Sequence, residues 1–184
     1  NYGLDGGGSY IVYDGQTYTK WGFIKAFGTP GVDYTNGPLE FIFEAVAFGF
    51  DVLGKAWALP NTVAGIGIGV AGLVVSELSG GQAFVSFGHN AIQFINNPLV
   101  DIEAAFALGN ALLFGIGYEP WKDGAYGDPR ANIGLHEQGH TYQAQLLGPF
   151  YLPVYMLVGG RTGPEGNPME AAAQEFAITH DPWS

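Results

Sequence analysis

The chain contains no cysteine and little charge, and both shortages limit what it can do. Without cysteine, neither a disulfide framework nor a zinc site built from thiolates can form among its 184 residues. Charged residues make up only 12% of the sequence, and 6 basic against 17 acidic residues give a net charge of −11. Nucleic-acid binding depends on basic side chains that neutralise phosphates, so this balance argues against a nucleic-acid partner. It does suit the attraction of a divalent cation.

The sequence also lacks an uninterrupted apolar run of membrane-spanning length. Its longest stretch of apolar residues and glycine, Val63 to Val75, has thirteen residues, whereas a helix needs about 18–20 to cross a bilayer. Gly65, Gly69 and Gly72 are spaced so that a neighbouring element can approach closely. We therefore expect a buried helix with a glycine face. Contact with a membrane is the less favoured alternative.

Three other regions carry secondary-structure signals. Two β-prone runs, Tyr10–Tyr13 and Gln16–Thr19, flank Asp14-Gly15 and predict a hairpin. Apolar residues cover most sides of the stretch from Pro38 to Trp57, which predicts a helix buried on most of its faces. Residues 82–118 contain two similar segments, each with a turn of Gly or Asn between β-prone runs, and these predict a small antiparallel sheet.

The chemistry of the chain is concentrated in one pattern, His136-Glu137-Gln138-Gly139-His140. On a helix the two histidines lie one turn apart on the same face, so both imidazoles can bind one metal ion. The glutamate lies beside them, where its carboxylate can accept a proton from a metal-bound water. Asn132 can cap the start of such a helix and Gly148-Pro149 can end it, which gives about four turns around the motif. The pattern is typical of zinc peptidases.

A catalytic zinc usually has three protein ligands and one open position. The third histidine of the metzincin pattern is missing, because Gln143 and Leu146 occupy its glycine and histidine positions. We predict Glu170 as the third ligand, contributed by a second helix in which neighbouring alanines allow close packing. Asn167, Pro168 and Glu170 also form a capping-box pattern, so Glu170 could instead serve only as a helix cap.

Three further residues are candidates for the same site. Glu175 is an alternative ligand, or an acceptor that fixes the orientation of a histidine ring. Tyr155 and His180 are candidates for stabilising the oxyanion that forms when water attacks a carbonyl group.

Four runs in the second half of the chain carry a family resemblance: Phe87–Leu99, Leu108–Asn110, His136–Gln145 and Leu147–Pro153. They resemble the metallopeptidase-type toxin domains at the C-terminal ends of bacterial Rhs-repeat and other polymorphic-toxin or secretion-effector proteins. The resemblance implies a gluzincin-like enzyme with a peptide or protein substrate and a cognate immunity protein. It also implies secretion or delivery into the periplasm or cytoplasm of a target cell.

These features predict one metallopeptidase-like domain over residues 1–184, as the C-terminal piece of a longer protein, because the chain begins without methionine or a signal pattern. The expected class is α+β: a mainly helical zincin-like domain with a small antiparallel sheet packed on the motif helix. In zinc peptidases an edge strand pairs with the substrate, and either segment of residues 82–118 could supply it.

The expected activity is hydrolysis of peptide bonds, with Zn²⁺ held by His136, His140 and Glu170 and with Glu137 as general base. Two alternatives remain open. One is a membrane-disrupting module built on residues 65–75 with a structural metal site. The other is a catalytically silent zinc-binding domain.

Overall fold

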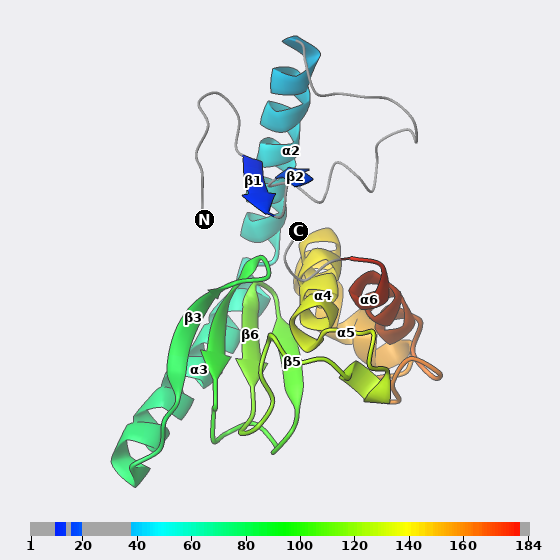
Figure 1. Ribbon diagram of the computed structural model, residues 1–184. Helices are drawn as coiled ribbons and strands as arrows, with labels where there is room; N and C mark the ends of the chain where they lie inside the picture. The colour runs from blue at the N-terminus through cyan, green and yellow to red at the C-terminus, as the bar shows by residue number, and fades with distance from the viewer. Residues whose placement is uncertain (1–9, 14–15, 20–37, 181–184) are drawn as a thin grey trace. The chain divides into compact units, whose positions relative to one another are not determined.

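The computed structural model describes residues 10–13, 16–19 and 38–180, with side chains from residue 48 to residue 180 (Figure 1). The chain divides into two compact units, residues 1–52 with 183–184 and residues 53–182. Each unit is described by itself below.

In the first unit, β1 (Tyr10–Tyr13) and β2 (Gln16–Thr19) pair antiparallel. The predicted hairpin is therefore confirmed in its two strands, while its turn, residues 14–15, lies outside the described residues. α2 (Pro38–Trp57) begins in the first unit and ends in the second, and its bounds agree with the predicted helix.

The second unit is built on a four-stranded sheet with the strand order β3-β4-β6-β5. The strands are β3 (Phe84–Gly88), β4 (Ala91–Ile95), β5 (Ala105–Leu108) and β6 (Ala111–Phe114). β3 and β4 form one antiparallel hairpin and β5 and β6 another, as predicted, but β4 and β6 run parallel. The α+β class is confirmed, with a sheet that is mixed rather than antiparallel. The sequence marks each hairpin locally and does not specify which strands become neighbours.

Two-residue turns close both hairpins at the same end of the sheet. His89 and Asn90 have φ angles of 48° and 61°, the left-handed values that a type I′ turn requires at both positions. In the second turn Gly109 has a φ of 61°, and the N–H of Asn110 donates to Oγ1 of Thr62 at 2.9 Å. The side chain of Asn110 donates to the carbonyl of Asn90 at 2.8 Å. The asparagines shared by the two segments therefore join the hairpins.

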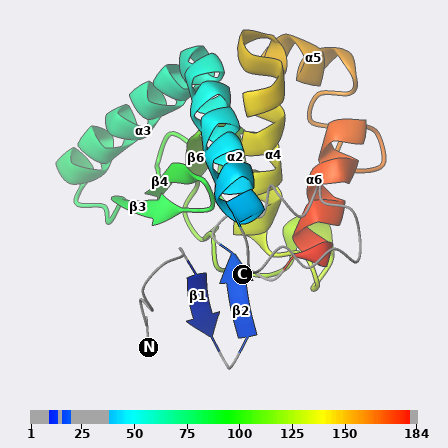
Figure 2. The ribbon, with the colours of Figure 1, turned by 90° about the horizontal axis from the view of Figure 1, so that it is seen from above.

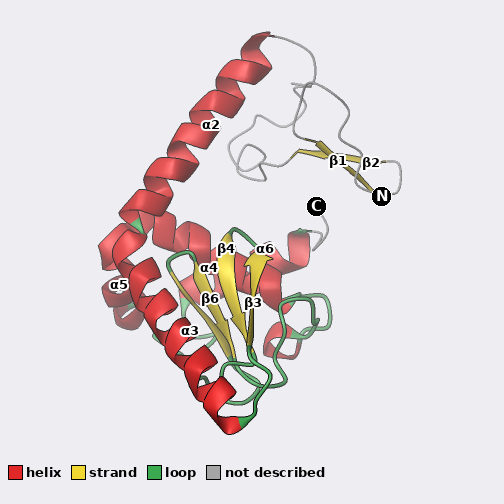
Figure 3. Cartoon of the chain, turned by 90° about the vertical axis from the view of Figure 1, so that its left-hand side faces the viewer, coloured by secondary structure: helices red, strands yellow, loops and turns green. Residues whose placement is uncertain are grey.

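α3 (Leu59–Ser79) packs against one face of the sheet through its glycines (Figure 3). The three glycines singled out in the sequence are all buried. A Cβ on Gly69 would lie 2.3 Å from the ring of Phe94, and one on Gly72 would lie 2.0 Å from Oδ1 of Asn97. Only glycine allows so close an approach, so the predicted glycine face is confirmed, with a sheet as its partner.

The opposite face of α3 is exposed, which corrects the expectation of a buried helix. Its exposed large apolar residues are Leu59, Val63, Val70, Val74, Val75 and Leu78. Among the described residues, this 21-residue helix is the one long and apolar enough to cross a membrane, and 22% of its apolar window is buried. The thirteen-residue run underestimates the length of the helix, which extends past both ends of the run.

The end of α2 in the second unit is also less buried than expected. Leu53 and Trp57 are 66% and 49% exposed, whereas Ala58, which follows them, is fully buried against Ala144 and Tyr151. The expectation of a helix buried on most sides is therefore wrong at this end, because the apolar residues wrap around the helix while only one side meets the fold.

Three helices complete the second unit: α4 (Ile133–Leu147), α5 (Tyr151–Leu157) and α6 (Pro168–Thr179). Short 3₁₀ turns, η1 (Ala125–Gly127) and η2 (Gly148–Phe150), precede α4 and α5. α4 and α6 lie side by side (Figures 1 and 2).

The central strand β6 separates two cores. Leu112 and Phe114 pack with Ile133 and other residues from the α4 and α6 side. Leu113, which points to the opposite face, packs with Ile68 of α3. This alternation follows the two-residue period of a strand and produces three layers, with α3, the sheet and α4 with α6 in succession.

Candidate metal centre

α4 presents the histidine motif from a well-defined helix start. Asn132 has an extended backbone, and its side-chain oxygen accepts a hydrogen bond from the N–H of Leu135 at 3.2 Å. This bond satisfies one of the free donors of the first turn and confirms the predicted cap. His136, Glu137 and His140 are only 3%, 5% and 3% exposed. Three polar side chains so deeply buried on one helix need partners from elsewhere in the fold.

α6 supplies the partner, Glu170. Its Oε2 lies 3.1 Å from Nε2 of His136, its Oε1 lies 3.3 Å from Nε2 of His140, and the two Nε2 atoms are 3.2 Å apart. The three side chains form a buried group that could hold a metal ion. The start of α6 is capped by Asn167, whose side chain accepts from the N–H of Met169 at 2.9 Å. The Glu170 carboxylate faces the histidines.

Small residues let α4 and α6 approach closely enough for this contact. A Cβ on Gly139 would lie 3.0 Å from Cα of Ala173, and Ala173 is fully buried. The glycine between the two histidines thus meets the alanine three residues after Glu170. Close packing through the alanines that follow Glu170 agrees with the sequence prediction.

The separations between donor atoms fit a tetrahedral ion. Zinc bonds of about 2.0–2.1 Å place tetrahedral ligands about 3.3–3.4 Å apart. The two histidine Nε2 atoms are 3.2 Å apart, and each has a different oxygen of the Glu170 carboxylate at 3.1 Å or 3.3 Å. Two imidazoles and a carboxylate suit zinc or a similar transition metal, whereas magnesium and calcium take oxygen ligands. Beside them, Oε2 of Glu137 is buried without a hydrogen-bond partner among the described residues. Such an atom is expected where a water or ion belongs.

Burial and the contacts among these side chains shift the pKa values of the cluster in different directions. Burial raises the pKa of Glu137, and the neighbouring His140 and His136 oppose this only in part. Burial alone would also raise the pKa of Glu170, but hydrogen bonds with both histidines outweigh it and lower the pKa. Burial would lower the pKa of His140, yet the hydrogen bond to Glu170 and the charge of Glu137 raise it. Two carboxyl groups whose pKa values shift in opposite directions are suited to two different chemical roles.

Two tyrosines border the cluster. The hydroxyl of Tyr155 on α5 donates a hydrogen bond to Oε1 of Glu170, so the structure brings this predicted residue to the site. Tyr126 in η1 lies with its ring centroid 5.3 Å from that of His136. Burial, followed by contact with Glu170, raises the pKa of both tyrosines, so both remain neutral donors.

Tyr126 did not emerge from the sequence. Its φ of 51° is in the left-handed region, which costs a non-glycine residue about 1–2 kcal/mol. The sequence signal that could have found it is its position next to Gly127 in a loop rich in glycine that leads to the motif helix.

Two glutamines lie behind the histidines and were also missed. Oε1 of Gln174 is 3.1 Å from Nδ1 of His136, and Oε1 of Gln143 is 2.9 Å from Nδ1 of His140. Gln143 comes three residues after His140 on α4, and Gln174 comes four residues after Glu170 on α6. Because residues three or four apart share a helix face, this spacing is a signal that could have found both.

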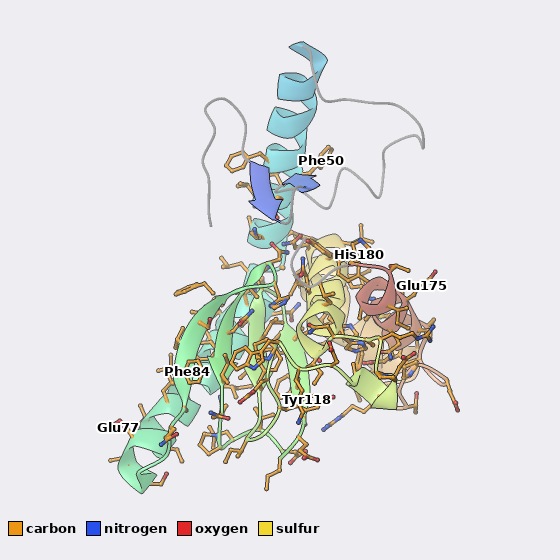
Figure 4. The ribbon with its side chains drawn as sticks, viewed as in Figure 1. Phe50, Glu77, Phe84, Tyr118, Glu175 and His180 are labelled. Carbon is orange, nitrogen blue, oxygen red and sulfur yellow. The ribbon has the colours of Figure 1, made fainter. Side chains whose placement is uncertain are left out.

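Glu175 and His180 are not brought to the site. Glu175 comes five residues after Glu170, about 140° around the helix axis, and it is exposed (Figure 4). His180 follows the end of α6 and stacks on Phe176, with 3.9 Å between ring centroids. Neither residue lines the cavity described next, and the carboxylate that the structure brings to the histidines is that of Glu170.

A cavity of about 620 Å³ opens beside the cluster. The motif residues and Glu170 line it, and residues 104–108, which include the whole of β5, line it as well. β5 is an edge strand with β6 on one side only among the described strands. The volume is typical of sites that bind small molecules or peptide side chains.

No protein-family model matches the chain, and no match is found among curated proteins or solved structures. The functional argument therefore starts from the site itself.

Proposed function

We propose that the chain is a zinc-dependent peptidase of the gluzincin type, with His136, His140 and Glu170 as zinc ligands and Glu137 as general base. The observation that carries the proposal is the convergence of the His136 and His140 Nε2 atoms, 3.2 Å apart, on the Glu170 carboxylate, next to a carboxylate oxygen of Glu137 that has no partner among the described residues. When bound, zinc supplies a Lewis acid that polarises the scissile carbonyl and acidifies water.

The chain's own residues account for the proton transfers. Glu137 accepts a proton from the attacking water and passes it to the leaving amine, so the proton count balances over the reaction. Burial raises the pKa of Glu137, which makes its carboxylate a stronger base. The hydroxyls of Tyr126 and Tyr155 are the proposed donors for the carbonyl oxygen as it gains negative charge. Tyr155 then exchanges its bond to Glu170 for one to this oxygen, because a phenol has one proton to donate.

The edge of β5 supports a peptide as the substrate. The N–H of Gly115 donates to the carbonyl of Ala104 at 2.8 Å, and the strand register continues with Ala105 opposite Phe114. Bonded and non-bonded pairs alternate along an antiparallel ladder. Ala105 and Ala107 therefore direct their N–H and C=O groups away from β6. An extended peptide in the cavity can pair with these groups.

Metal analysis and a cleavage assay test the proposal. We expect about one zinc per chain and cleavage of a mixed peptide library, followed by mass spectrometry. The Glu137→Gln variant should keep zinc and lose about 10²–10⁴-fold in kcat, whereas Glu175→Gln, an exposed change on α6, should behave like the wild type. Wild-type protein without stoichiometric metal would overturn the proposal. Zinc without any cleavage would instead indicate the catalytically silent domain.

The resemblance to toxin domains supplies a biological setting for this activity. We infer that the enzyme acts in a target cell and is neutralised by a cognate immunity protein. Expression of the wild type and of Glu137→Gln, each with and without a periplasmic signal, tests this inference. Growth arrest by the wild type alone, in one compartment, is the expected result, and equal growth in all cases would contradict it.

A membrane-disrupting module is a second candidate, favoured by the exposed apolar face of α3. Its partner would be a lipid bilayer, and the metal cluster would then be structural. Release of a dye from liposomes by the wild type and equally by Glu137→Gln would support this candidate. Leakage that depends on Glu137, or no leakage, would exclude it.

A further inference from the structure

Each histidine of the metal cluster has a glutamine behind it, from two different helices. Nδ1 of His136 lies 3.1 Å from Oε1 of Gln174 on α6. Nδ1 of His140 lies 2.9 Å from Oε1 of Gln143 on α4. The other ring nitrogen of both histidines, Nε2, faces the Glu170 carboxylate.

The orientation of each glutamine amide is set by a second hydrogen bond. Nε2 of Gln174 donates to the carbonyl of Ala125 at 2.8 Å, and Nε2 of Gln143 donates to the carbonyl of Met169 at 2.8 Å. A backbone carbonyl can only accept, so the amide nitrogen must face it. The amide oxygen must then face the histidine.

This orientation decides which ring nitrogen carries the proton. An amide oxygen cannot donate, so Nδ1 of His136 and of His140 must carry a proton and donate it. In a neutral imidazole with Nδ1 protonated, Nε2 keeps its lone pair for a metal. Without an ion, the hydrogen bonds from Nε2 to Glu170 require a proton on Nε2, and metal binding would release that proton.

We propose that Gln143 and Gln174 are positioning residues that hold both histidines in the tautomer with Nε2 free to bind metal. The inference rests on the proposed function only in taking the cluster as a metal site. An amide fixes the ring without adding charge, so the negative charge near the ion remains that of Glu170 and Glu137. A carboxylate at either position would place an oxygen against the carbonyl that the amide nitrogen now meets.

The same bonds connect the cluster to the rest of the site. Gln143 reaches Met169, the residue before the ligand Glu170, and so joins the end of α4 to the start of α6. Gln174 reaches Ala125, the residue before Tyr126, and so joins α6 to η1. Loss of either amide would therefore remove two contacts together, one to a histidine ring and one to the backbone beside Glu170 or Tyr126.

The affinity for zinc, measured by competition with a chromophoric chelator, tests the inference without any substrate. We expect Gln143→Leu and Gln174→Leu to weaken zinc binding about 10- to 100-fold each. Gln138→Leu is the matched control, because Gln138 on α4 donates to Tyr142 and contacts neither histidine of the cluster. The control should bind zinc within about twofold of the wild type, and urea unfolding would verify that each variant is folded.

Nitrogen-15 NMR of histidine rings in the wild type provides a readout that does not depend on any variant. In the zinc-loaded protein, Nδ1 of both motif histidines should carry a proton and Nε2 should not. Unprotonated Nδ1, or zinc affinities of both leucine variants equal to that of the control, would overturn the inference and leave the proposed peptidase intact. Weakened zinc binding in both leucine variants, together with a wild type that binds zinc but cleaves no peptide, would support the inference and refute the peptidase.

Discussion

The hydroxyl of Tyr155 donates a hydrogen bond to Oε1 of Glu170, the same carboxylate oxygen that lies 3.3 Å from Nε2 of His140. A tyrosine from α5 thus contacts the carboxylate that α6 contributes to the cluster. Its pKa is raised by burial and by the Glu170 carboxylate, so the phenol stays protonated and remains a donor.

Removal of this hydroxyl in Tyr155→Phe should weaken zinc binding about tenfold, because a partner that orients a ligand is lost. At saturating zinc, the variant should still lose about 10²–10³-fold in kcat if the phenol turns from Glu170 to donate its one proton to the oxyanion. Chelator competition measures the first effect and initial rates with a cleaved peptide measure the second. Tyr142→Phe, which alters a tyrosine bonded to Gln138, is the control. Unchanged affinity and rate would remove Tyr155 from the site.

A pair of substitutions on α6 separates the roles of metal ligand and helix cap. Glu170→Ala should abolish stoichiometric zinc binding, because the cluster loses one of three donors. Asn167→Ala should keep zinc but lower the free energy of unfolding by about 1–2 kcal/mol, because Asn167 caps the helix. Metal analysis and urea unfolding of both variants measure these effects. Zinc retained by Glu170→Ala would show that another residue is the ligand.

Local sequence patterns predicted the parts of this site that lie on one helix. The helical spacing of His136 and His140, the cap at Asn132 and the start of α6 at Asn167 depend on residues close in sequence, and the structure contains all of them. Glu170 could be chosen only by pairing two helices, and the small residues beside it supplied the reason for that choice.

What the sequence did not predict depends on contacts between distant segments. The parallel pairing of β4 with β6 joins two hairpins whose order no local pattern specifies. Tyr126 reaches the site from η1 through a left-handed backbone, and Gln174 does so through its contact with His136, 38 positions away. The exposed side of α3 was missed because apolar residues lie on most sides of the helix, while the side buried against the sheet is narrow and consists mainly of glycines.

The glycines of α3 give a stability test with an internal control. Gly69→Ala places a Cβ 2.3 Å from the fully buried ring of Phe94, so we expect the free energy of unfolding to fall by about 1–3 kcal/mol. In Gly67→Ala, on the same helix, the added Cβ meets nothing within 4 Å. This variant should raise the free energy of unfolding by about 0.5–1 kcal/mol, because alanine has a higher helix propensity than glycine. Urea unfolding of the two variants measures the difference. Equal stabilities would contradict the packing of α3 on the sheet.

If the substrate pairs with β5, cleavage should depend on the backbone N–H groups of alternate substrate residues. Because Ala105 and Ala107 direct their backbone groups outward and Phe106 directs its own toward β6, a bound peptide can bond to the strand only at alternate residues. N-methylation of each peptide nitrogen in turn, in a peptide that the enzyme cleaves, should reduce kcat/KM about tenfold at alternate positions, the loss of about one hydrogen bond. The intervening nitrogens point away from the strand and should tolerate the methyl group. A loss that is equal at neighbouring positions would show that the cavity binds its substrate without the strand edge, even if zinc and Glu137 act as proposed.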